Sequence, residues 1–165
     1  MSTFDDAFEE VIGLEGGYVF DPDDRGGETK YGIAKRWHRD VDIKSLTLEE
    51  AKQIYWREYW NPLLLAQLMP RVAIEVFEQA INMGRVQAVI HLQRSLAMLG
   101  EQLSEDGLIG GQTILAANRT WLRYKSVVLQ VMNGFQFIRY LEIIKGDPSQ
   151  KKYFVGWLRR VAILR

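Results

Sequence analysis

The sequence EGGYVFDPDDRGGETKYGI, residues 15–33, decides how the chain is organised. It contains Pro22 and five glycines between Gly16 and Gly32. Glycine and proline at this density exclude a helix over most of residues 16–36. Connections between helices usually have about 2–8 residues, and this stretch is much longer. We therefore expect a functional loop or a small irregular β region at residues 16–36.

On both sides of this stretch, apolar residues recur at the spacing of amphipathic helices. A capping box formed by Thr47 and Glu50 marks one helix start, and Pro70 is placed to begin another. The pattern lacks the alternation of strands and helices that is typical of parallel sheets, so the predicted fold class is mainly α. The expected helices span residues 3–14, 47–60, 70–82, 86–99, 114–118 and 121–145, with a last one around 153–161.

Composition indicates an ordinary globular protein. The 165 residues are 47% hydrophobic and 25% charged, with 21 basic and 21 acidic residues. The absence of cysteine excludes disulfides, thiol catalysis and cysteine-ligated metals, and two histidines, His38 and His91, are too few for a histidine-rich metal site. The acidic N-terminus is unlike a signal peptide, and no apolar run is long enough to span a membrane. We expect a protein made in the cytoplasm without stable membrane insertion.

Charge is distributed unevenly along the chain. Residues 1–60 contain 14 acids and 8 bases, a net charge of −6, whereas residues 101–165 contain 5 acids and 10 bases, a net charge of +5. This difference indicates two lobes with different tasks, although solvated helix faces that differ in sign would give the same pattern. The basic residues are scattered over several helices without a recognised motif, so we expect no nucleic-acid partner.

The residues of the glycine-rich stretch suggest carboxylate chemistry. Glu15 falls at the expected end of helix 3–14, where an anion is electrostatically unfavourable, and this makes it a candidate active-site residue. Further carboxylates at 21, 23, 24 and 28 and the hydroxyl of Thr29 follow across a turn. Glycoside hydrolysis needs such a set: one protonated carboxyl as acid, and a second, ionised group that activates water or stabilises the oxocarbenium ion.

Structural roles for the same residues remain open. Asp21, Asp23 and Asp24 are also common turn formers and helix caps. A Ca²⁺ site is a further alternative, but the spacing lacks the twelve-residue loop that ends in glutamate. We expect no metal and no cofactor.

The motif Glu-Gly-Gly-Tyr at 15–18, followed by Asp-Pro-x-Asp-x-Gly-Gly-x-Thr-x-Tyr-Gly-Ile at 21–33, resembles the signature of the glycoside hydrolase 108 family. The similarity continues through residues 51–60 and 72–84. Residues 92–93, 106–113 and 154–161 are similar to the peptidoglycan-binding half that accompanies this family. The resemblance implies a lysozyme-like fold of two helical lobes, a catalytic lobe at 1–90 and a peptidoglycan-binding lobe at 91–165 packed on it.

The resemblance also implies residue roles. The essential glutamate of the family falls on Glu15, and the spacing of phage-type lysozymes places further catalytic groups at Asp24 and Thr29. The sequence departs from the family at Glu78, where aspartate is more frequent, and at Gly111, where proline is usual.

Several side chains are candidates for sugar binding. Asn82 is suited to bind an acetamido group or to cap its helix, and any single aromatic outside the loop is also a candidate core residue. The aromatic candidates are Tyr18, Tyr31, Trp37 and Trp60.

We therefore expect an endolysin-like N-acetylmuramidase, an antimicrobial protein of the kind that bacteriophages use for cytolysis. It would cleave the β-1,4 bond between N-acetylmuramic acid and N-acetylglucosamine in peptidoglycan, acting as a monomer in the periplasm after holin-dependent release. The alternative is a non-catalytic protein that binds the cell wall or assists secretion.

Overall fold

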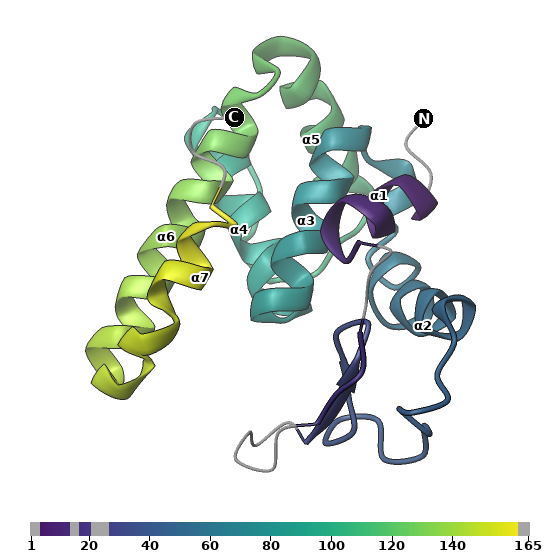
Figure 1. The fold of residues 1–165 in the computed structure, drawn as a ribbon. Coiled ribbons are helices and arrows are strands. Elements are labelled where there is room, and N and C mark those ends of the chain that lie inside the picture. Colours follow the sequence, from purple (N-terminus) through teal and green to yellow (C-terminus); the bar gives the residue numbers. More distant parts are fainter. Residues whose placement is uncertain (1–3, 14–16, 21–26, 162–165) are drawn as a thin grey trace.

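The computed structural model describes residues 4–13, 17–20 and 27–161. Their fold is mainly α with one small antiparallel sheet, as predicted, and Figure 1 shows this sheet beside α2, at the lower end of a body of helices. The helices are α1 (Phe4–Val11), α2 (Leu48–Tyr55), α3 (Pro70–Met83), α4 (Arg85–Met98), α5 (Gly111–Tyr124), α6 (Val127–Gly146) and α7 (Phe154–Leu158). A π-helical turn (Trp56–Trp60), two 3-10 turns (Leu65–Gln67, Pro148–Tyr153) and strands β1 (Val19–Phe20), β2 (Glu28–Lys30) and β3 (Ile33–Ala34) complete the described elements.

Helix α1 ends at Val11, three residues earlier than the pattern predicts. Gly13 stops it by adopting the left-handed conformation, with φ +77°, and its amide donates to the carbonyl oxygen of Glu9 at 3.1 Å. Helix α1 therefore ends before the predicted catalytic residue Glu15, which lies outside the described residues.

The sheet confirms the β region predicted at residues 16–36. Its strand order is β1-β2-β3, and Thr29 in the central strand is paired with Val19 on one side and Ala34 on the other. Tyr31 and Gly32 form the two-residue turn between β2 and β3, and both have positive φ, as a type I′ turn requires.

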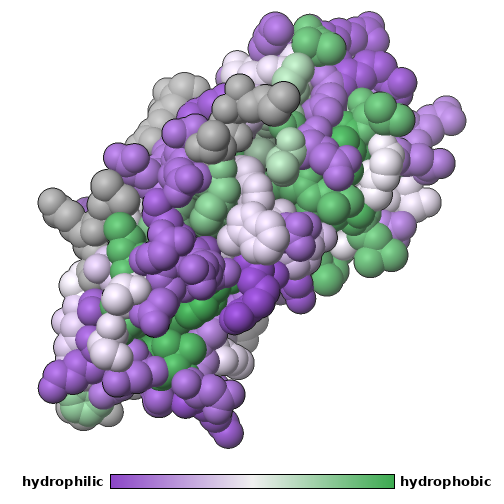
Figure 2. All heavy atoms as spheres, turned by 90° about the vertical axis from the view of Figure 1, so that its right-hand side faces the viewer, coloured by the Kyte–Doolittle hydropathy of each residue, from purple (hydrophilic) through white to green (hydrophobic). Residues whose placement is uncertain are grey.

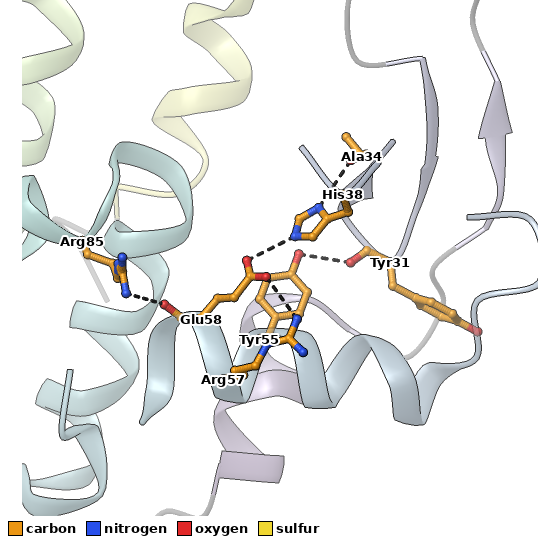
Figure 3. Close-up of polar contacts among 7 residues, drawn as sticks. All are labelled: Tyr31, Ala34, His38, Tyr55, Arg57, Glu58 and Arg85. Atoms are coloured by element: carbon orange, nitrogen blue, oxygen red, sulfur yellow. Dashed lines mark hydrogen bonds and ion pairs between the residues drawn. The ribbon is translucent and has the colours of Figure 1, made fainter. Parts of the chain in front are cut away.

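Gly32 fits tightly against α2. A Cβ atom at this position would lie 2.5 Å from the hydroxyl oxygen of Tyr55. That hydroxyl donates a hydrogen bond of 3.1 Å to the carbonyl oxygen of Tyr31, which attaches the turn to α2 (Figure 3). The sequence therefore needs glycine here for two reasons, backbone conformation and space.

Glu58 in the π-helical turn links the segment after the sheet to α4. His38 Nε2 lies 3.1 Å from Glu58 Oε2, and the guanidinium of Arg85 donates to the Glu58 carbonyl oxygen at 3.2 Å (Figure 3). These contacts hold the sheet region against the helices that carry the candidate site.

Local signals place the next two helices correctly. Thr47 caps α2 and exchanges hydrogen bonds with Glu50 in the predicted capping box, and Pro70 is the first residue of α3. The π-helical turn after α2 brings Trp60 into the core, where it is 4% exposed and contacts Phe4 and Phe77 edge to face. Burial therefore favours the core role for Trp60 over the sugar contact that the sequence also left open.

The break between α5 and α6 lies at Lys125, not at residues 119–120 as predicted. Lys125 has φ +53°, and its amide closes α5 by donating to the Trp121 carbonyl oxygen at 2.8 Å. No glycine or proline marks this position, so the local sequence does not reveal the break. Helix α6 continues through Gly134 without interruption.

One hydrophobic core runs through both halves of the chain. It includes Phe8 of α1, Val76 and Phe77 of α3, Leu92 of α4 and Met132 of α6, all fully buried. Figure 2 shows that on one face of the molecule hydrophilic residues cover most of the surface and hydrophobic residues form separate patches. Within the described ranges, no helix combines the length and hydropathy needed to cross a bilayer.

We predict that Gly32→Ala destabilises the protein by about 1–3 kcal/mol, because the substitution is strained at positive φ and meets Tyr55. Gly17→Ala is the matched control, since a Cβ there meets no atom within 4 Å. Thermal unfolding monitored by circular dichroism measures both. Equal melting temperatures for the two variants would contradict this account of the turn.

We also predict that a chain ending at Gly100 does not fold. It would lack α5 and α6, which pack on α4 and contribute Ala117 and Met132 to the core that contains the fully buried Leu92 and Leu96. Exposing each leucine costs about 1.5–3 kcal/mol. Circular dichroism should show no cooperative melting, and a cooperatively folded fragment would show that the first half is independent.

Candidate functional site

A groove of about 590 Å³ lies where the two halves of the chain meet. The end of α1, the β2–β3 turn at Gly32, α3, α6 and the segment after α7 all contribute to its walls. Its charged and amide side chains are those of Glu10, Arg71, Glu75, Glu78, Asn82, Arg159 and Arg160.

Glu78 is one of two carboxyls of this groove whose pKa is raised by burial. Removal from water raises its pKa to about 7, and the nearby Glu75 acts in the same direction. Asn82 Nδ2 donates to one carboxyl oxygen at 2.7 Å, and Gln136 Nε2 donates to the other at 2.9 Å. A carboxyl with this pKa holds its proton about half of the time at neutral pH, so Glu78 is able to donate or accept a proton there.

Glu75 lies one turn before Glu78 on α3, and burial raises its pKa as well. Gln79 Nε2 donates to Glu75 at 2.8 Å, and Gln79 Oε1 lies 2.7 Å from His91 Nδ1. Burial lowers the pKa of His91 to about 4, so the imidazole is neutral at neutral pH and donates through Nδ1 to Gln79. This network fixes the orientation of the Glu75 carboxyl from the side of α4.

Asn82 presents a hydrogen-bond acceptor to the groove. Both hydrogens of its amide are used by Glu78, since Nδ2 lies 2.8 Å from the backbone carbonyl oxygen and 2.7 Å from the carboxyl. The side-chain oxygen accepts no hydrogen bond from the residues that the structure describes, and it suits an acetamido N–H or a sugar hydroxyl. The helix cap is Gly84, with φ +88°, so capping does not explain Asn82.

The structure separates the other predicted site residues from these groups. Tyr18 is exposed and donates to Glu28 at 3.0 Å, Thr29 is half-buried within β2, and Tyr31 forms the turn before Gly32. None of these three side chains lines the groove, whereas Asn82 does. The predicted catalytic residues at 15 and 24 lie outside the described residues.

Sequence reasoning did not identify the acidic pair of α3 as site residues. Glu78 attracted notice only as a departure from the family pattern. A usable signal was present, because Glu75 and Glu78 are the only acids between residues 61 and 100 and stand in a mostly apolar helix. Among the residues that the structure describes, no group of three or more acidic or histidine side chains is arranged to hold a metal ion.

Comparison with known proteins divides the chain at the junction of α3 and α4. Residues 8–84 match the family model described as "Glycosyl hydrolase 108", and residues 87–162 match the one described as "Predicted Peptidoglycan domain". The chain is similar to a solved structure described as "Structure of Brucella abortus SagA", with 28% identity and a TM-score of 0.75 over 96% of this chain and 89% of that one. A search of curated proteins finds no match.

We predict that Glu78→Gln stabilises the protein at neutral and alkaline pH. The folded-state pKa of about 7 lies above the ordinary value of 4.5, so the folded state binds the extra proton. The stability of the wild type therefore falls as the pH rises from 4.5 through 7. The amide removes this loss, with a gain on the order of 1–3 kcal/mol at pH 8 and little gain at pH 4.

Denaturant unfolding at several pH values measures this effect, with Glu9→Gln on the exposed face of α1 as the control. The same stability difference between wild type and Glu78→Gln at pH 4 and pH 8 would contradict the raised pKa of Glu78.

Proposed function

We propose that this member of a peptidoglycan hydrolase family is an N-acetylmuramidase with Glu15 as general acid. The chain joins a glycosyl hydrolase 108 half to a peptidoglycan domain, and this combination supports the proposal. The bond cleaved is the β-1,4 bond between N-acetylmuramic acid and N-acetylglucosamine. The groove between the two halves is the observation that carries this proposal, because it would place a glycan strand against residues of both.

The position of Glu15 in the sequence supports its role. It follows Ile12, a groove-lining residue, by three positions, and it precedes a sheet whose β2–β3 turn lines the same groove through Gly32. Segments on both sides of Glu15 thus border the groove.

The reaction needs one proton donor and one ionised partner. Glu15 gives its proton to the glycosidic oxygen as the bond to the anomeric carbon breaks. The carboxylate of Asp24 stabilises the oxocarbenium ion or takes a proton from the water that adds to this carbon, and the hydroxyl of Thr29 helps to place that water. Asn82 accepts a hydrogen bond from the sugar, and Tyr18 and Tyr31 contact the strand beyond the groove.

Glu78 has a supporting role in this scheme. A carboxyl that is partly protonated at neutral pH adds less negative charge to the groove than an ordinary glutamate. The anionic wall polymer therefore meets less repulsion there.

We further propose that the protein acts as a monomer without a cofactor on periplasmic peptidoglycan, which it reaches through holin-dependent release during phage cytolysis. Such a protein would have antimicrobial activity against permeabilised Gram-negative cells. The alternative function, wall binding or assistance to secretion without catalysis, predicts adsorption to peptidoglycan without release of reducing sugar.

We predict that Glu15→Gln lowers hydrolysis of purified peptidoglycan at least a hundredfold, equal to about 2.7 kcal/mol of barrier, because an amide cannot donate the proton. Reducing-sugar release measures the rate, and Glu9→Gln should keep the wild-type rate. A parallel Glu78→Gln variant tests whether Glu78 supplies the proton instead of Glu15.

A near-wild-type rate for Glu15→Gln together with a hundredfold loss for Glu78→Gln would transfer the acid role to Glu78. Wild-type protein that binds peptidoglycan without releasing reducing sugar would favour the non-catalytic alternative.

A further inference from the structure

A second cavity of about 220 Å³ lies next to the groove. The two cavities share Asn82 and Arg160 in their walls, so the smaller one forms a side pocket of the groove. Its other walls come from the end of α3, the second half of α6 and α7. The pocket is therefore built by the hydrolase half and the peptidoglycan-domain half together.

We propose that this side pocket binds the lactyl group of a muramic acid residue together with the first residues of its peptide stem, whose own carboxylate would meet the arginines. The inference rests on the proposed function, since it assumes that the glycan strand occupies the groove. It adds to that function a preference for sugars that carry a peptide.

The charge of the side pocket fits an anion. Arg139 and Arg160 line it, and none of its described lining residues is acidic, whereas the groove itself contains Glu10, Glu75 and Glu78. Arg139 also donates to Glu142 at 3.1 Å, but this pair is exposed and contributes little stability. A guanidinium has five N–H donors, so Arg139 can bind a ligand carboxylate while it keeps this contact.

The remaining walls suit a short substituent with apolar carbons. The rings of Tyr140 and Trp157 stack with centroids 4.9 Å apart, and Met83 and Ile143 add further apolar surface. Tyr140 is 2% exposed, and Gln136 Nε2 lies 3.3 Å from its hydroxyl, so this wall is held in place from the core. Methyl groups such as those of lactate and alanine would pack against it.

The size of the pocket and its entrance limit the ligand further. Pockets for drug-sized ligands usually have about 300–1,000 Å³, so 220 Å³ admits a short chain but not a second sugar strand. At the entrance, the side-chain oxygen of Asn82 can accept an N–H from the sugar or from the first amide of the stem, since only the amide nitrogen is used by Glu78 among the described contacts. A substituent that leaves the groove at Asn82 would thus reach the two arginines.

The test compares two substrates: intact peptidoglycan and the same material freed of its stems by an amidase. For wild type we expect a higher kcat/KM on the stem-bearing substrate. Arg139→Gln should lower the ratio of kcat/KM on the stem-bearing substrate to kcat/KM on the stem-free substrate at least fivefold. The reason is that Arg139 lines the side pocket but not the groove. Arg123→Gln, an exposed residue of α5 outside both cavities, is the control and should keep the wild-type ratio.

Ile143→Trp provides a second variant that fills the pocket without removing a charge, and it should lower the ratio in the same way. If Arg139→Gln is not folded by circular dichroism, this variant decides the question. An unchanged ratio in a folded variant would overturn the proposal.

Binding of muramyl dipeptide, measured by calorimetry, separates this inference from the proposed function. If wild type hydrolyses neither substrate, the proposed function fails, but the side pocket is still testable. We expect Arg139→Gln to raise the Kd for muramyl dipeptide at least fivefold. An equal Kd for wild type and Arg139→Gln would overturn the proposal.

Discussion

Burial of α3 by both halves of the chain is the constraint on which the rest of the structure depends. Val76 and Phe77 are fully buried in a core that continues into α4 and α6. Once this apolar face is covered, the opposite side of the helix must border the groove, and it carries Glu75 and Glu78 there. Hydrophobic packing therefore places two carboxyls where water is partly excluded, although their own solvation opposes this placement.

The surrounding polar side chains make this placement tolerable. Asn82 and Gln136 donate to Glu78, and Gln79 donates to Glu75 while it accepts from His91. Most of these partners lie on other turns or other helices, so they orient the two carboxyls, while burial raises the pKa of both. Stability that is given up at a buried acid is common at functional sites.

The groove and its side pocket belong to neither half alone. Gly32 and the end of α1 form one wall, whereas Leu129 and the arginines after α7 come from the peptidoglycan domain. Hydrogen bonds hold these walls in place (Figure 3). Tyr55 binds the β2–β3 turn, and Glu58 contacts both His38 and Arg85. In the proposed function, the peptidoglycan-domain half therefore shapes the groove and influences which sugars are cleaved.

The sequence by itself determined the features that depend on neighbouring residues: the capping box at Thr47, the start of α3 at Pro70, and the glycine-rich turn at Gly32. Its motifs also identified the family. Only the tertiary structure decided that Trp60 is buried, that α5 ends at Lys125 and that Glu78 lies in a desolvated groove. Burial and pKa depend on residues such as Gln136, 58 positions away in the chain, and no local pattern reports such contacts.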